Sequence, residues 1–277
     1  MRKLIFVMVD ALGFETAGKR GGYLEHLTEY HMAAKYRVRG ELPSASRPMY
    51  ETLMTGVPVW IHGIATNGVS RRSRCENLFS LCKKNGGVTA AAAFMWISEL
   101  YNGTCPFRMY QDRIQMKGKG DIDYGLFYSD CSYPDSHLYA DGEFLRKQYA
   151  PDFLLIHPMH TDTVGHPYGC ASKEYQEAAD YSLQNVANLL EGWRAAGYDV
   201  IVTGDHGMDE LGIHGGNEPI QREVPLYIVS DQVKGGDFTQ QEISNLEIAP
   251  LACHLLGISP AEGMKQEIHV EMKKEEK

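Results

Sequence analysis

The chain has 277 residues, of which 43% are hydrophobic and 23% are charged, and its formal net charge at pH 7 is −9. A chain of this length and composition buries a substantial core without disulfides. The acidic balance argues against a protein that coats nucleic acid, because such binding needs clustered Lys and Arg, but it allows small phosphate ligands, because bound metal ions supply local positive charge.

The first predicted element is an apolar run at residues 4–9, which follows Arg2 and Lys3 and superficially resembles the start of a signal peptide. Asp10 ends the run too early for such a peptide, and no small-residue cleavage site follows. No stretch approaches the roughly 20 apolar residues that cross a bilayer. The six cysteines form no CxxC pair, as is typical of reduced structural thiols. We therefore expect a cytoplasmic protein without a membrane anchor, of unspecified oligomeric state.

Short apolar runs alternate with longer helical patterns along the rest of the chain. The predicted strands are residues 4–9, 88–94, 153–157, 200–203 and 224–229. The predicted helices are residues 49–54, 76–84, 143–149, 173–196 and 248–256. Strands that alternate with helices imply a mainly parallel sheet covered by helices on both faces. We therefore predict an α/β three-layer sandwich that forms one domain over residues 1–277.

Residues 102–135 interrupt this alternation. They are rich in Gly, Asp, Tyr and Cys and show no clean periodicity. Their aromatic residues are unlike the composition of a solvated tether, so we predict an insertion or lid over the sheet. The charged residues 271–277 are expected to be frayed.

The chemically informative residues follow the predicted strands, where ligands of open α/β sheets bind. They are Asp10 after the first strand, Asp162 and His166 after the third, Asp205 and His206 after the fourth, and His214 shortly afterwards. Three carboxylates and three imidazoles suit borderline divalent cations such as zinc. A single Asp in such a place is more often a helix cap, so it is their joint occurrence that indicates a metal site. His157 and His160 are candidates for partners of these ligands.

A candidate nucleophile lies in the hydroxyl-rich segment 42–56, where a loop is predicted to lead into a helix. The N-terminus of a helix offers free amides and a positive dipole end, which favour a phosphate group. Ser44 and Ser46 both lie at this junction. The alternative interpretation is that they only cap the helix, as Ser often does.

Taken together, the motifs resemble the alkaline phosphatase superfamily, and most of all its type I phosphodiesterase/nucleotide pyrophosphatase branch. The similarity covers nearly the whole chain. Its motifs are the strand ending at Asp10, Ser46-x-Pro48, Thr55-Gly56, His62-Gly63-Ile64, Asp162-x-x-Gly165-His166, Asp205-His206-Gly207-Met208 and His214-Gly215-Gly216. The resemblance implies a central sheet flanked by helices and two divalent metal ions, zinc or alternatively manganese.

The resemblance also implies a role for each residue. One ion would be held by Asp162, His166 and His214. The other would be held by Asp10, Asp205 and His206 together with the nucleophile, Ser46. The implied reaction is hydrolysis of a phosphodiester or nucleotide pyrophosphate bond through a covalent phospho-serine intermediate.

Two positions depart from the pattern of the branch, which usually has Thr as nucleophile and Asn three residues later. This chain has Ser46 and Met49 there, and Met49 cannot usefully hydrogen-bond a phosphate oxygen. Arg47 is a candidate replacement, because a guanidinium binds phosphate in a bidentate way; the alternative is a solvent-facing side chain. Asn67 is a further candidate for substrate contact, with a structural turn as its alternative.

Other activities of the superfamily stay open: a phosphomonoesterase, a phosphonate hydrolase or a phosphotransferase. A sulfatase is disfavoured, because Tyr50 stands where such enzymes need Arg. A metal-stabilised binding protein without catalysis is disfavoured by the intact nucleophile and ligand positions. The chain shows no third acidic cluster, and the aromatic residues of 102–135 would suit a second substituent. Both features favour a diester or nucleotide anhydride over a monoester.

Overall fold

The computed structural model describes residues 1–103, 105–117 and 120–273, and a nine-stranded sheet in the order β4-β5-β3-β6-β1-β7-β8-β2-β9 runs through these residues. The strands are β1 (Lys3–Val9), β2 (Ala34–Arg39), β3 (Thr89–Phe94), β4 (Ile114–Met116), β5 (Tyr124–Tyr128), β6 (Phe153–Ile156), β7 (Tyr198–Gly204), β8 (Glu223–Val229) and β9 (Gly236–Ser244). Neighbouring strands are parallel except for the pairs β4–β5, β7–β8 and β2–β8. The predicted mainly parallel α/β sheet is confirmed.

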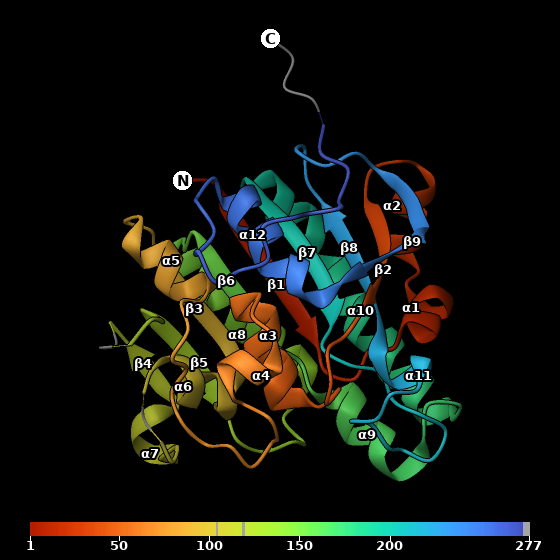
Figure 1. Cartoon of the computed structure of the whole chain (residues 1–277), viewed down its shortest axis with the longest axis horizontal. Coiled ribbons are helices and arrows are strands. Elements are labelled where there is room, and N and C mark those ends of the chain that lie inside the picture. Colours follow the sequence, from red (N-terminus) through yellow and green to blue (C-terminus); the bar gives the residue numbers. More distant parts are fainter. Residues whose placement is uncertain (104, 118–119, 274–277) are drawn as a thin grey trace.

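Helices cover both faces of this sheet (Figure 1). They are α1 (Phe14–Arg20), α2 (Tyr23–Glu29), α3 (Ser46–Thr55), α4 (Val59–His62), α5 (Leu78–Lys84), α6 (Met95–Tyr101), α7 (Met109–Asp112), α8 (Asp135–Tyr149), α9 (His160–Tyr168), α10 (Lys173–Ala195), α11 (Pro219–Arg222) and α12 (Ile248–Leu256), with a 3-10 turn at Asn245–Glu247. None of the helices in the described ranges is long and apolar enough to cross a membrane.

The central strand β1 packs against both layers of helices. Its residues alternate between two hydrophobic clusters, because successive side chains of a strand point to opposite faces. Leu4, Phe6 and Met8 pack with residues of α3, α5 and α12, whereas Ile5 and Val7 pack with residues of α8 and α10. Both faces of β1 are therefore buried, which is why the strand reads as a continuous apolar run.

The segment 102–135, predicted as an insertion or lid, contributes two strands to one edge of the sheet. β5 pairs in parallel with β3, and β4 pairs antiparallel with β5. Ile122 and Phe127 are buried in the main core. In its described residues the segment therefore extends the sheet sideways. Residues 104 and 118–119 of this segment, and residues 274–277 of the tail predicted to be frayed, lie outside the described residues.

Candidate active site

The predicted metal ligands come from three neighbouring strands, β6, β1 and β7, which are parallel and end at the same edge of the sheet. Asp10 follows β1 directly, and Asp205 and His206 follow β7. Helix α9, which begins after β6, carries Asp162 and His166. The loop between β7 and α11 supplies His214. Parallel pairing thus brings residues that are distant in the sequence to one place.

Asp10, Asp205 and His206 form a fully buried cluster at this edge. His206 Nε2 lies 3.4 Å from Asp10 Oδ1 and 3.3 Å from Asp205 Oδ2. Within the described part of the chain, these two carboxylate oxygens are buried and have no hydrogen-bond partner. A buried charged oxygen without a partner is costly unless a cation coordinates it. The two unpartnered oxygens therefore fit a metal ion.

A second, more open group of ligands lies beside the first. His166 Nε2 lies 3.4 Å from Asp162 Oδ2, and His214 Nε2 lies 3.7 Å from Asp162 Oδ1. The rings of His206 and His214 stack with their centroids 4.0 Å apart, which joins the two groups. The candidate ligand atoms of Asp162, His206 and His214 lie within 4.8 Å of one another, as do those of Asp10, Asp205 and His206. His166 stands outside both of these sets, and its side chain is 51% exposed.

All three imidazoles are oriented in the same way. In each ring Nδ1 faces a backbone carbonyl oxygen, at 3.0 Å for His166 and Gly212, 2.9 Å for His206 and Gly207, and 3.3 Å for His214 and Ser44. A carbonyl oxygen only accepts, so in the neutral ring Nδ1 carries the proton and Nε2 keeps its lone pair. Metal-binding histidines are typically oriented by such a contact, and in these rings the free Nε2 faces the carboxylates.

The electrostatics of the buried carboxylates also fit a cation. Burial, followed by the charges of Asp205 and Asp162, raises the pKa of Asp10 well above its usual value. Burial likewise raises the pKa of Asp205 to about 8, although the Ala11 N–H donates to its Oδ1. Desolvation and mutual repulsion therefore oppose the ionised forms, and a divalent cation would offset both. The donor set of carboxylates and imidazoles suits the borderline divalent ions expected from the sequence.

Ser46 is the first residue of α3, and its hydroxyl lies against the buried cluster. Ser46 Oγ is 3.1 Å from His206 Nε2, and the residue is 4% exposed. The N-cap of α3 is Ala45, so Ser46 is not the capping residue. The other candidate, Ser44, donates its hydroxyl to Gly216 O at 2.8 Å. Of the two serines, Ser46 is therefore the one in position to serve as a nucleophile.

Arg47 is neither free to bind phosphate nor facing the solvent, which corrects both alternatives drawn from the sequence. Its guanidinium is 2.8 Å from Glu99 Oε2 and donates to Val69 O at 3.1 Å. It also lies 4.5 Å above the ring of Trp96. The side chains of Arg47 and Glu99 are 3% and 5% exposed. The positive charge of Arg47 is therefore neutralised in a buried ion pair.

Asn67 lies next to the start of the nucleophile helix. Its side-chain Oδ1 accepts a hydrogen bond of 2.9 Å from the backbone N–H of Arg47, the residue after Ser46. This contact fixes the orientation of the amide, because the acceptor end is turned to the helix. The acceptor end of the Asn67 amide is therefore bound to the backbone of the residue that follows Ser46.

Tyr50 and His157 are two buried residues of the site to which no definite role could be assigned from the sequence. The Tyr50 hydroxyl donates to Asp10 Oδ2, and His157 Nε2 lies 3.2 Å from the same oxygen. His157, one of the two histidines considered as partners of a ligand, thus contacts the candidate ligand Asp10. The position of Tyr50 four residues after Ser46 is the signal that points to its role, because such residues share one face of a helix.

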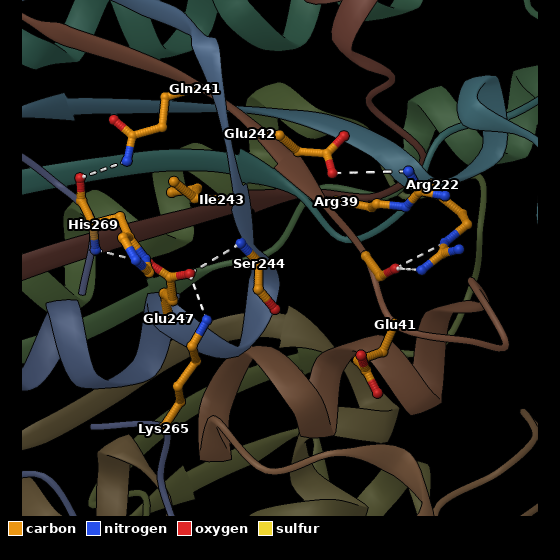
Figure 2. A pocket seen from close by; sticks show the side chains of 11 residues that line it. Arg39, Glu41, Arg222, Gln241, Glu242, Ile243, Ser244, Glu247, Lys265 and His269 are labelled. Carbon is orange, nitrogen blue, oxygen red and sulfur yellow. Dashed lines mark hydrogen bonds and ion pairs between the residues drawn. The ribbon is translucent and has the colours of Figure 1, made fainter. Parts of the chain in front are cut away.

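A separate pocket of about 350 Å³ lies between β2, β9 and the C-terminal segment (Figure 2). Most of its charged side chains bind one another or the backbone. Glu247 accepts from Lys265 at 2.7 Å and lies 3.0 Å from His269 Nδ1, and Arg222 donates to Gly40 O at 2.6 Å. None of the candidate site residues lines this pocket.

Comparison with known sequences points to one group of enzymes. A family model described as type I phosphodiesterase / nucleotide pyrophosphatase matches residues 4–262. Venom phosphodiesterase 2 of Crotalus adamanteus is 26% identical over 219 residues, which are 72% of this chain and 26% of that protein. GPI ethanolamine phosphate transferase 3 of Eremothecium gossypii is 22% identical over 242 residues, which are 82% of this chain and 23% of that protein. The chain thus spans about a quarter of the length of these relatives.

Comparison with solved structures finds proteins with the same fold. Human ectonucleotide pyrophosphatase / phosphodiesterase 5 matches with a TM-score of 0.73 and 14% sequence identity, over 94% of this chain and 96% of that chain. At this identity the similarity shows the shared arrangement of sheet and helices.

Proposed function

Since the chain belongs to the type I phosphodiesterase / nucleotide pyrophosphatase family, we propose that it is a two-metal hydrolase of phosphate esters with Ser46 as its nucleophile. Its fold is the alkaline-phosphatase-like α/β sandwich predicted from its motifs. One observation carries the proposal. Ser46 Oγ lies 3.1 Å from His206 Nε2, in a cluster in which Asp10 Oδ1 and Asp205 Oδ2 lack hydrogen-bond partners among the described residues.

The proposed ligand sets follow the resemblance and are supported by the geometry. Asp10, Asp205 and His206, with Ser46, would hold one ion. Asp162, His166 and His214 would hold the other. His206 lies close to both sets. His166 Nε2 lies 3.4 Å from Asp162 Oδ2, and the His166 ring lies 5.1 Å from that of His214. Zinc suits mixed carboxylate and imidazole donors, and manganese is the alternative.

Bound divalent cations would lower the pKa of the Ser46 hydroxyl and neutralise charge on the attacking and leaving oxygens. Ser46 Oγ loses its proton to solvent and attacks phosphorus, and the leaving group departs with the electron pair of its bond to phosphorus. Water entering from the leaving-group side then cleaves the phosphorylated or nucleotidylated serine. The N-terminus of the ten-residue helix α3, where Ser46 lies, favours the negative charge of the phosphate.

We further propose that the substrate is a phosphodiester or a nucleotide anhydride. A monoester dianion presents one more charged oxygen than a diester and needs an additional positive group. Arg47 is the side chain next to the nucleophile, and its charge is taken by Glu99 at 2.8 Å. Asn67, whose Oδ1 accepts from the Arg47 N–H, would offer its Nδ2 group as a neutral donor. A neutral donor suits the single charge of a diester.

The test compares the steady-state kinetics of zinc-loaded protein on an aryl diester and on the matching aryl monoester. We expect a higher kcat/KM for p-nitrophenyl thymidine 5′-phosphate than for p-nitrophenyl phosphate. A preference for the monoester would move the assignment to a phosphatase. Turnover of aryl phosphonates alone, or transfer to an added alcohol in place of water, would indicate a phosphonate hydrolase or a phosphotransferase. A protein that binds metal but turns over none of these substrates would be a binding protein.

Asn67→Ala is expected to lower kcat for the diester by about 10²-fold, the usual cost of removing one donor to a developing oxyanion. Metal content should stay unchanged. Asn67→Asp keeps an acceptor for the Arg47 N–H, but it loses the donor and adds a negative charge beside the phosphate. If Asn67→Asp retains full activity while Asn67→Ala loses it, Asn67 acts by orienting the helix and not by contacting the phosphate.

A further inference from the structure

The two oxygens of Asp10 have different surroundings. Oδ2 receives the hydroxyl of Tyr50 and lies 3.2 Å from His157 Nε2. Oδ1 lies 3.4 Å from His206 Nε2, and no hydrogen-bond partner for it exists in the part of the chain that is described. Asp10, Tyr50 and His157 are all fully buried. The carboxylate is therefore held through one oxygen, and the other oxygen is left facing the ligand cluster.

The hydrogen-bond pattern of His157 shows that it donates to Asp10. The backbone N–H of Phe94 lies 3.4 Å from His157 Nδ1 and donates to it. A ring nitrogen that accepts carries no proton, so the proton of the neutral ring is on Nε2, the atom next to Asp10 Oδ2. The Tyr128 hydroxyl donates to the His157 carbonyl at 2.8 Å, and the Tyr50 ring packs edge-on against the imidazole at 4.6 Å. The ring is thus fixed on several sides.

Tyr50 connects the ligand to the nucleophile helix. It lies on α3 four residues after Ser46, and residues with this spacing lie on one face of a helix. From this face Ser46 Oγ approaches His206 and the Tyr50 hydroxyl reaches Asp10 Oδ2. The position of the nucleophile and the rotamer of Asp10 are therefore coupled through a single helix.

We propose that Tyr50 and His157 are positioning residues that fix the rotamer of Asp10 and present its Oδ1 to a metal ion. This inference rests on the proposed function, because it takes Asp10 to be a metal ligand. The physical reason is that the rotamer of a buried carboxylate is set by the hydrogen-bond donors within reach of its two oxygens. Two donors on Oδ2 remove the competition for Oδ1, so less ordering is needed when a cation binds.

The test measures metal binding and not turnover. Metal-free protein is titrated with zinc in competition with a chromophoric chelator, and the melting temperature is recorded with and without zinc. We expect Tyr50→Phe and His157→Leu each to weaken one of the two zinc equivalents by about 10–100-fold, the usual effect of losing a partner of a metal ligand. The other equivalent should keep its affinity, and the zinc-induced rise in melting temperature should shrink.

Two further variants separate positioning from general stability. His157→Gln places an amide donor near the position of Nε2 and should restore most of the lost affinity. Tyr139→Phe is the matched control, because the Tyr139 hydroxyl is also buried but lies 3.4 Å from Ser182 Oγ, on helix α10. It should leave both zinc affinities unchanged. Tyr50→Phe removes a single oxygen and is expected to fold, so this variant alone is sufficient for the test if His157→Leu does not fold.

The inference is overturned if Tyr50→Phe lowers the melting temperature equally with and without zinc while both affinities stay at wild-type values. It is also overturned if Tyr139→Phe weakens zinc binding as much as Tyr50→Phe does. Failure of the proposed function gives a different result. In that case the wild-type protein would bind zinc through Asp10 and Tyr50→Phe would bind it more weakly, yet neither protein would turn over any phosphate ester.

Discussion

Ser46→Ala is expected to abolish turnover while leaving the fold and the metal content nearly unchanged. The substitution deletes the oxygen that attacks phosphorus, and a covalent route has no substitute for its nucleophile. A fall in kcat on the order of 10³-fold or more is expected. The structural cost should be small, because Ala45 and not Ser46 is the N-cap of α3 and because Ala has the highest helix propensity.

Two control variants show whether the loss of activity is due to the Ser46 hydroxyl. Ser44→Ala removes a hydroxyl that donates to Gly216 O at 2.8 Å and should keep activity within a few-fold of wild type. Ser46→Thr keeps the hydroxyl and should retain measurable turnover. Initial rates on an aryl diester, melting curves and elemental analysis of zinc provide the readouts. Near wild-type rates for Ser46→Ala, together with an inactive Ser44→Ala, would show that Ser44 is the nucleophile.

The strands predicted from the sequence are those in the middle of the sheet. β1, β3, β6, β7 and β8 read as apolar runs, because helices cover both of their faces. β2 and β9, which were not predicted, lie at one edge. β2 contains Lys35 and Arg37, which pair with Glu25 at 2.7 Å and Glu223 at 3.3 Å. Charged residues interrupt such a strand without preventing its formation, because their partners come from elsewhere in the chain.

In the candidate site too, some residues could be predicted from the local sequence, whereas others depend on contacts made only in the folded chain. Asp10 and Asp205 could be predicted, since each follows a buried strand and belongs to a motif. The contact between His157 and Asp10 depends on the parallel pairing of β6 with β1. The order of strands and helices along the chain does not reveal which strands pair. The partner of Arg47 is likewise tertiary, because Glu99 comes from α6, a helix that was not predicted. The sequence therefore indicates the candidate ligands better than the side chains that contact them.

Removal of metal ions is expected to abolish activity, and addition of zinc, or alternatively manganese, should restore it. The reason lies in the buried carboxylates, whose oxygens at Asp10 Oδ1 and Asp205 Oδ2 have no partner among the described residues. Without cations the Ser46 hydroxyl keeps its ordinary low reactivity. The measurement is the rate of diester hydrolysis after dialysis against a chelator, before and after titration with each metal. Full activity in protein shown by elemental analysis to contain no metal would rule out the two-metal mechanism.

The same experiment has a pH dependence whose sign follows from Asp205. Burial raises the pKa of this carboxyl to about 8 in the folded chain, against 3.8 for an ordinary Asp. Below that pH the metal-free site holds a proton that zinc must displace, so the apparent zinc affinity should rise with pH and level off above about 8. Metal-free protein should lose stability as the pH rises from about 4 toward 8, because the unfolded chain has already released the proton that the folded chain retains. Zinc should remove this loss, since it replaces the proton as the partner of the buried carboxylate. A zinc affinity that falls as the pH rises through this range would show that Asp205 is not among the ligands.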